Sequence, residues 1–113
     1  MAIIQSEHRY AQIAATKVNR LLPIIRGQEV GFSLQLLGAL PHRGARLVET
    51  VIRTAAANAA EAGARNVERL RISHATANCG PTQKRIRPRA RGMAYLERHR
   101  SSHIRIGISV PEL

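Results

Sequence analysis

Hydrophobic residues along this chain of 113 residues recur with two different spacings. In the first half they lie three or four positions apart, as on one face of a helix, over segments 16–26, 29–40 and 43–62. Each segment is followed directly by a glycine or a proline, residues that commonly end helices. The pattern therefore predicts three helices, the last of them beginning at His42 or Arg43.

The first predicted helix contains a proline, Pro23. Inside a helix, proline removes one backbone hydrogen bond and clashes with the preceding turn, at a cost of about 3 kcal/mol. We therefore expect a kink near residues 19–22, or a shorter helix.

After residue 63 the hydrophobic spacing changes to two, which is the period of a strand. In segment 67–78, every second position from residue 70 is occupied by Leu70, Ile72, His74 and Thr76. Alternating positions in segment 103–110 are Ile104, Ile106, Ile108 and Val110. These two segments are expected to form strands that pair antiparallel, and residues 2–8 to form a further short strand.

The connection between the paired strands, residues 79–101, is 23 residues long, whereas loops in compact domains usually have about 4–6 residues. It has too few apolar residues for a core of its own. It is either a flexible loop or a continuation of the two strands as a ribbon reaching about 30 Å from the body, at about 3.3 Å per residue. Such a ribbon is marginal in water, so a partner would have to order it.

These elements predict one α+β domain, residues 1–113, with three helices packed on a small antiparallel sheet and a long protruding β-hairpin. The body comprises residues 1–78 and 102–113, and the hairpin residues 79–101.

The charge of the chain is high and uneven. Eighteen Lys and Arg against seven Asp and Glu give a net charge of +11, and sixteen of the cations are Arg. Residues 81–105 hold eight cations and one acid, Glu97. Because arginine binds phosphate through two parallel hydrogen bonds and stacks on bases, nucleic acid is the leading partner, ahead of membrane or acidic protein.

The candidate binding residues are mostly in the connection. The densest run is Lys84, Arg85, Arg87, Arg89 and Arg91. Pro88 and Gly92 predict a tight turn at the tip, and Ile86 is placed to wedge against bases or sugars. Beyond the run, Arg98, His99, Arg100 and His103 add to the same surface.

Cations in the body leave two readings open. Lys17, Arg20 and Arg26 on the first helix form either an ordinary polar face or a second RNA contact, and the pairs His8–Arg9 and His42–Arg43 are equally undecided. With only three aromatic residues, Tyr10, Phe32 and Tyr95, the chain lacks a platform for stacking single strands. Phosphate contacts and shape are therefore favoured, and so is a folded RNA.

Catalytic and metal-binding readings are weak. His99, His103 and Cys79 are only a weak candidate for a zinc site, because zinc sites usually have paired cysteines and this chain has a single one. Cys79 has no oriented histidine–acid pair for nucleophilic catalysis. We expect no catalytic residue, cofactor or metal. The single cysteine fits a reducing compartment, and the sequence contains neither a secretory signal nor an apolar run of the about 20 residues that span a membrane.

Residues 80–110, GPTQKRIRPRARGMAYLERHRSSHIRIGISV, resemble the hairpin and last strand of the universal large-ribosomal-subunit protein twenty-two family. TKVNRLLPIIRG (16–27) looks like that family's first helix and AAANAAE (55–61) like part of its long helix. The resemblance covers about residues 7–110. It departs from the family at Pro23, at Ala14 (where a capping serine is common) and at Met93 (where a basic residue is frequent).

The resemblance implies a structural protein of the large ribosomal subunit that binds large-subunit rRNA and supports assembly. It implies a body on the outer surface of the subunit and a hairpin that runs through rRNA to the wall of the nascent-peptide exit tunnel. The implied tip consists of Gln83, Lys84, Arg85, Ile86, Arg87, Pro88, Arg89, Ala90, Arg91, Gly92 and Met93. In that family, changes associated with macrolide resistance fall near the tip, by position on the stretch from Gln83 to Arg85.

The implied partners are large-subunit rRNA, neighbouring ribosomal proteins and the nascent polypeptide, with no membrane and no small-molecule substrate. The expected location is a cytoplasmic ribosome, and an organellar ribosome is the less favoured alternative. Two rivals remain: a free-standing nucleic-acid-binding protein (an RNA chaperone or DNA-compacting protein), and a small RNA-acting enzyme using His74, His99 or His103. The second is disfavoured because no carboxylate is expected near these histidines.

Overall fold

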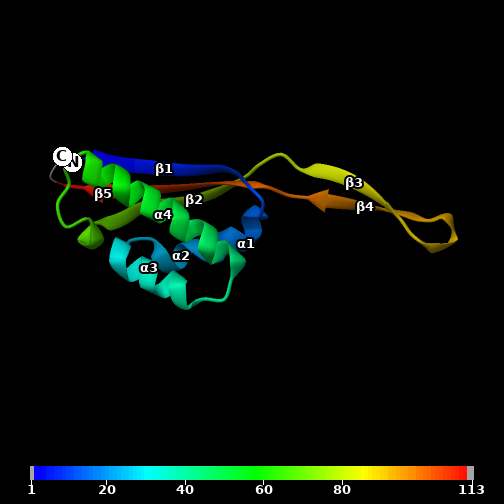
Figure 1. The fold of residues 1–113 in the computed structure, drawn as a ribbon, viewed down its shortest axis with the longest axis horizontal. Coiled ribbons are helices and arrows are strands. Elements are labelled where there is room, and N and C mark those ends of the chain that lie inside the picture. Colours follow the sequence, from blue (N-terminus) through cyan, green and yellow to red (C-terminus); the bar gives the residue numbers. More distant parts are fainter. Residues whose placement is uncertain (1, 112–113) are drawn as a thin grey trace.

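The computed structural model describes residues 2–111 and shows an elongated molecule, 64 × 25 × 18 Å along its principal axes. Its radius of gyration is 17.1 Å, whereas a compact domain of this length has about 13 Å. The excess comes from a two-stranded hairpin that projects from one end of the body (Figure 1). The reading of the long connection as an extended ribbon is confirmed.

The body is built on a three-stranded antiparallel sheet with the order β1-β5-β2. Its strands are β1 (Ala2–Ala11), β2 (Arg71–Cys79) and β5 (Ser102–Val110). The central strand β5 carries the clearest alternation in the sequence, and its apolar positions Ile104, Ile106, Ile108 and Val110 are fully buried. Both predicted strands and their antiparallel pairing are confirmed, and the short first strand extends to Ala11.

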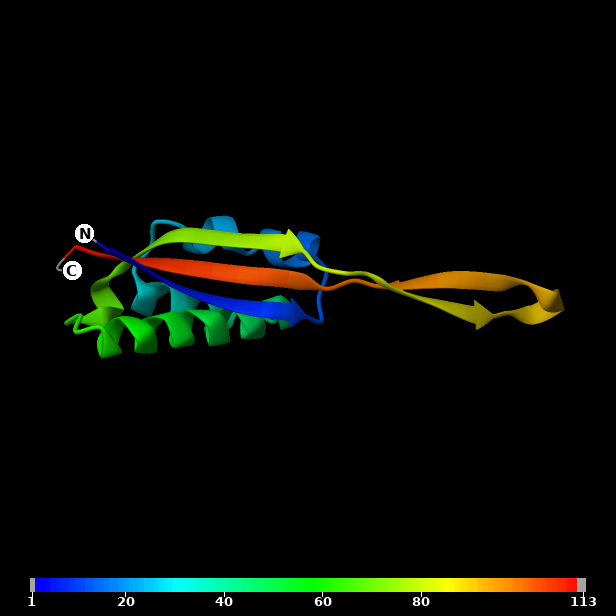
Figure 2. The same ribbon diagram turned by 90° about the horizontal axis from the view of Figure 1, so that it is seen from above.

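Helices cover one face of this sheet, and the opposite face is open (Figure 2). They are α1 (Ala15–Asn19), α2 (Leu22–Ile25), α3 (Val30–Ala39) and α4 (Arg43–Glu61). The longest, α4, buries Val48, Val51, Ile52, Ala55 and Ala59, as its apolar spacing predicts. The α+β class is confirmed, with the first of the three predicted helical segments divided into α1 and α2.

Pro23 explains this division. It lies in the first turn of α2, where no intrahelical partner exists for its missing N–H. The chain bends at Arg20 and Leu21, within the range in which a kink was predicted. Ala14 precedes α1 and makes no side-chain cap, in keeping with its departure from the family pattern.

The expected alternation of β2 is wrong in its second half. The strand begins at Arg71, after a short 3₁₀ helix, η1 (Val67–Arg69). A bulge places Ser73 and His74 opposite the single residue Gly107. Even-numbered residues are buried before the bulge, as Ile72 is, and odd-numbered residues after it, as Ala75 and Ala77 are. His74 and Thr76 are exposed instead of lying inward.

Gly107 accommodates this bulge because it has no side chain. A Cβ at this position would lie 3.1 Å from Ile3 Cγ2 and 3.2 Å from His74 Cβ. A glycine in the middle of a strand commonly marks a bulge or a close approach of this kind.

The outer edge of β2 is covered by the segment that contains α1 and α2. Gly27 N–H donates to Ile72 O (2.8 Å), and Ile72 N–H donates to Gln28 O (3.0 Å). Arg26 donates through Nε and Nη2 to Ala75 O, at 2.9 and 2.7 Å. Covering an edge in this way satisfies its backbone groups and prevents pairing with another chain.

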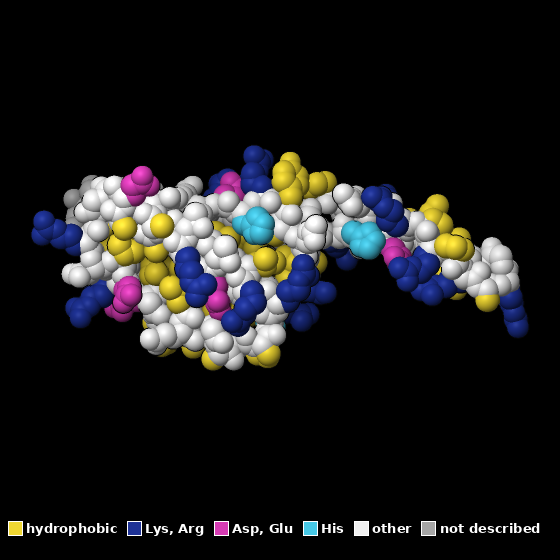
Figure 3. Space-filling model, viewed as in Figure 1, with side chains coloured by type: hydrophobic (Ala, Val, Ile, Leu, Met, Phe, Trp, Pro, Cys, Tyr) yellow, Lys and Arg dark blue, Asp and Glu magenta, His cyan; other side chains and the backbone are white. Residues whose placement is uncertain are grey.

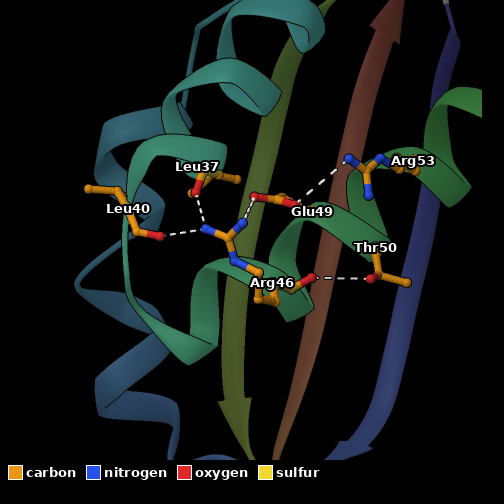
Figure 4. Close-up of polar contacts among 6 residues, drawn as sticks. All are labelled: Leu37, Leu40, Arg46, Glu49, Thr50 and Arg53. Atoms are coloured by element: carbon orange, nitrogen blue, oxygen red, sulfur yellow. Dashed lines mark hydrogen bonds and ion pairs between the residues drawn. The ribbon is translucent and has the colours of Figure 1, made fainter.

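Helices α3 and α4 are joined by a polar cluster around Arg46 (Figure 4). Arg46 Nη2 donates to the Leu37 and Leu40 carbonyls at the C-terminal end of α3. Its Nη1 lies 3.1 Å from Oε1 of Glu49, whose side chain is only 8% exposed. Arg53 Nη2 lies 3.8 Å from the other carboxylate oxygen.

Candidate nucleic-acid interface

The hairpin leaves the body through a fixed junction at Gly80 and Pro81. Gly80 N–H donates to Ser101 O (2.9 Å), and Ser101 Oγ donates to Pro81 O (2.7 Å). A Cβ on residue 80 would lie 2.5 Å from Ser101 Oγ. The two chain segments therefore cross so closely that glycine fits best here.

Beyond the junction, β3 (Gln83–Pro88) and β4 (Ala94–His99) pair antiparallel. Residues directly opposite each other share a face of the ribbon, and successive residues alternate between faces. One face carries Gln83 with His99, Arg85 with Glu97, and Arg87 with Tyr95. The other carries Lys84 with Arg98, Ile86 with Leu96, and Pro88 with Ala94.

The first face is polar and contains the one acid of the hairpin. Arg87 Nε lies 2.8 Å from Glu97 Oε1, and His99 Nε2 lies 3.8 Å from Oε2. The expectation that no carboxylate lies near these histidines is therefore wrong for His99. Strand alternation explains this contact, because residues 97 and 99 point to the same side.

The second face is apolar in its middle and basic at its base. Ile86 is 74% exposed and Leu96 is 46% exposed. Lys84 lies directly opposite Arg98, and like charges in this position destabilise a strand pair. An anion bound between these two side chains would relieve the repulsion.

The tip is a tight turn over residues 89–93, as Pro88 and Gly92 predict. Arg89 N–H donates to Met93 O (2.6 Å), and the short helix η2 (Ala90–Gly92) lies between them. Arg91 and Gly92 both have positive φ, 63° and 71°. Glycine adopts this conformation at no steric cost, whereas arginine is held in it by the turn.

Most hairpin cations are not used within the protein. Every residue from 81 to 100 is exposed except the half-buried Glu97. Figure 3 shows Lys and Arg side chains in dark blue at intervals along the hairpin to its tip. In the part of the chain that the structure describes, no hydrogen bond or ion pair from the side chain is made by Lys84, Arg89, Arg91, Arg98 or Arg100.

The body cations differ in what they contact. Lys17 and Arg20 are exposed on or beside α1. Arg26 is bound to the edge of β2 through two of its donor atoms. Of these three residues, Arg26 therefore has an observed structural role, and a second RNA contact by any of them stays a prediction.

Five of the predicted residues line one groove of about 750 Å³ where the hairpin meets the body: Lys17, Gln83, Arg98, His99 and Arg100. Gln83, predicted at the tip, therefore lies at the base of the hairpin, opposite His99. Arg43, which the sequence leaves undecided, and Tyr10, which nothing in the sequence selects, also line it. His103 is adjacent, and its Nδ1 accepts a hydrogen bond from Tyr10 N–H (3.0 Å).

The other candidate chemistries find little support in the geometry. His74, His99 and His103 lie on β2, β4 and β5 respectively, and the His99–Glu97 pair is on a solvent-exposed ribbon. Across residues 2–111, no three His, Cys, Asp or Glu side chains are grouped so as to hold a metal ion. Nor does that range contain a helix long and apolar enough to cross a membrane.

We expect Glu97→Gln to strengthen RNA binding about fourfold at 0.15 M salt, because it frees one cation, Arg87, to displace a counterion from phosphate. The partly exposed Arg87–Glu97 pair contributes less than about 1 kcal/mol to the hairpin, so little order is lost. Titration of a structured RNA with the full chain at several salt concentrations measures this. Glu61→Gln, at the exposed end of α4, is the matched control; weaker binding by the Glu97 variant would contradict the expectation.

Comparisons with known proteins find one family over nearly the whole chain. Residues 6–109 match the model of the family described as ribosomal protein L22p/L17e. A large ribosomal subunit protein uL22 of Caldicellulosiruptor saccharolyticus is 46% identical over 98 residues, covering 87% of this chain and 80% of that protein. The uL22 proteins of Finegoldia magna (42% identical, covering 93% and 94%) and Rhodopirellula baltica (39%, covering 96% of each) are similar over nearly their whole lengths.

The family match spans both parts of the molecule, since it begins within β1, includes the helices and the complete hairpin, and ends within β5. The resemblance noted over about residues 7–110 is therefore confirmed. On this evidence the chain belongs to the ribosomal protein L22p/L17e family.

Proposed function

We propose that this protein is a structural constituent of the large ribosomal subunit, which binds large-subunit rRNA, supports its assembly and lines the nascent-peptide exit tunnel with its hairpin. The observation that carries the proposal is the hairpin itself. It is exposed over almost its whole length, has no core, and directs unpaired arginines away from the body. A structure of this kind is stable only with a partner around it, and its charge requires that the partner be anionic.

The proposed rRNA contacts follow the hairpin from junction to tip. The main ones are Lys84, Arg85, Arg87, Arg89, Arg91, Arg98, His99 and Arg100, with His103, Lys17, Arg20 and Arg26 as contacts of the body. The stretch predicted to face the tunnel, residues 83–93, runs from the first pair of the ribbon to the turn at residues 89–93, so this turn is the part that reaches farthest toward the tunnel. The apolar pair Ile86 and Leu96 is suited to contact sugars and bases between the phosphate contacts.

The two parts of this single domain have separate roles. The body, residues 1–78 and 102–113, anchors the protein on the outside of the subunit beside neighbouring ribosomal proteins. The hairpin, residues 79–101, reaches inward and meets the nascent polypeptide. The protein acts by binding and shaping RNA in a cytoplasmic ribosome, with no catalytic step of its own.

Crosslinking in cells tests the proposal. The tagged protein is crosslinked to RNA and the attached fragments are sequenced. We expect clusters on large-subunit rRNA, including fragments beside the exit tunnel. Crosslinks scattered over messenger RNA or DNA would instead identify a free-standing nucleic-acid-binding protein and overturn the ribosomal assignment.

A further inference from the structure

The groove between body and hairpin carries only positive charge. Lys17 comes from α1, Arg43 is the first residue of α4, and Arg98 and Arg100 lie at the end of the hairpin. No Asp or Glu is among the residues that line it. Its volume, about 750 Å³, is within the range of pockets that bind small organic groups, and its charge selects an anion.

The walls of this groove are held in place by backbone contacts. Arg43 donates from Nη2 to Gln12 O, which fixes its guanidinium beside the segment between β1 and α1. The opposite wall is fixed by the hydrogen bonds of Gly80 and Ser101 at the junction. The Arg43 guanidinium and the backbone beside Arg100 are therefore in place before any ligand binds.

Tyr10 contributes an aromatic side chain to the groove. Its φ is 58°, an uncommon conformation for a residue other than glycine. The β1–β5 register shifts between His8 and Ala11, and the displaced Tyr10 N–H donates to His103 Nδ1. Strained backbone of this kind occurs preferentially at binding sites.

The ring of Tyr10 is available for contact, since the residue is 59% exposed. It packs at right angles to His103, with 4.9 Å between ring centroids. Arg9 lies 5.9 Å from the ring centroid, at the outer limit of a cation–π contact. A chain with few aromatic residues thus exposes one of them in a groove lined by cations.

We propose that this groove binds one unpaired nucleotide of the rRNA. Its base packs against Tyr10, and the adjoining phosphates are bound by Lys17, Arg43 and Arg100. Cations with no acid favour RNA phosphate over a mixed-charge peptide, and an aromatic ring in a concavity suits a base that is outside a duplex. The inference rests on the proposed function, and it makes the junction a second anchor besides the hairpin.

Photocrosslinking and chemical probing of large subunits test this site. Large subunits are purified from cells that carry the full-length protein. Ultraviolet irradiation and mass spectrometry are expected to find a nucleotide adduct on Tyr10. Base-specific probing is expected to find one unpaired nucleotide that is protected in the wild-type subunit and stays protected with Tyr10→Phe. With Tyr10→Ala, the reactivity of this nucleotide should rise about tenfold, because one base–aromatic stack is lost.

Two further variants control this experiment. Tyr95→Ala removes the other exposed tyrosine, on the hairpin, and is expected to leave that nucleotide protected. If Tyr10→Ala does not fold, the double variant Lys17→Ala/Arg100→Ala, at two exposed positions, is expected to raise the same reactivity about threefold.

Two results would overturn the groove site alone. One is crosslinking of Tyr10 to a peptide in place of a nucleotide. The other is unchanged reactivity of every nucleotide in the variants, while the variant protein is present in the subunit. Absence of the protein from large subunits would instead overturn the proposed function. The two failures are therefore distinguishable.

Discussion

Replacing Arg85, Arg87 and Arg89 together with alanine is expected to lower affinity for large-subunit rRNA about 100-fold at 0.15 M salt. Losing three phosphate contacts makes the plot of log affinity against log salt concentration less steep by about 2–3. At 0.15 M salt, a change of this size in the slope corresponds to the expected loss of affinity. The body should remain folded, because all three side chains are exposed and only Arg87 has an ionic partner, Glu97. Incorporation into large subunits should fall with affinity.

The measurement compares subunit fractions from gradients with the thermal unfolding of the purified variant. A matched control, Arg53→Ala/Arg65→Ala/Arg69→Ala, removes the same charge from exposed positions on the body. We expect it to incorporate almost normally. Equal loss in both variants would show that net charge alone matters, and an unfolded body in the hairpin variant would refute the separation of roles.

Arg46→Ala is expected to lower the free energy of unfolding by about 2–3 kcal/mol. The Glu49 carboxylate would lose its 3.1 Å partner while its side chain is only 8% exposed, and a buried charge without a partner is costly. The last carbonyls of α3 would also lose the donor that caps them. The expected loss is below that of a fully buried pair, because the Arg46 side chain is itself 48% exposed.

Urea unfolding followed by circular dichroism measures this change. Arg53→Ala, which removes the more distant cation at 3.8 Å, should cost less than about 1 kcal/mol. Adding Glu49→Gln to Arg46→Ala should recover about 1 kcal/mol, since the buried negative charge is then absent. Equal losses from Arg46→Ala and Arg53→Ala would mean that the cap and the close ion pair contribute no more than the distant ion pair of Arg53.

Hydrophobic spacing predicted most elements because each is amphipathic in its own right. In α4 and β5 one face is apolar and the other polar, so the period of three to four or of two reports directly which side is buried. The break at Pro23 was equally predictable, because proline acts through its own backbone. The bulge in β2 was not, since it depends on Gly107 in a distant strand and on the close approach of Ile3.

The candidate interface also has one part that the sequence predicted and one part that it did not. The hairpin cations are adjacent in sequence, so their density was visible without a structure. The groove was not visible, because it assembles residues from β1, α1, α4 and the hairpin, and because Tyr10 lies in it only as a result of a register shift. Contact between His99 and Glu97 depends on the strand conformation of β4.

Local periodicity and the charge of neighbouring residues were therefore enough to predict the α+β class, the position of the basic hairpin and an anionic partner. The contacts of each arginine became known from the three-dimensional structure alone: Arg46 is bound to the end of α3, whereas Arg89 and Arg91 remain available. The physical reason is that the hydrogen-bond partners of a side chain are set by backbone groups brought together from distant parts of the chain.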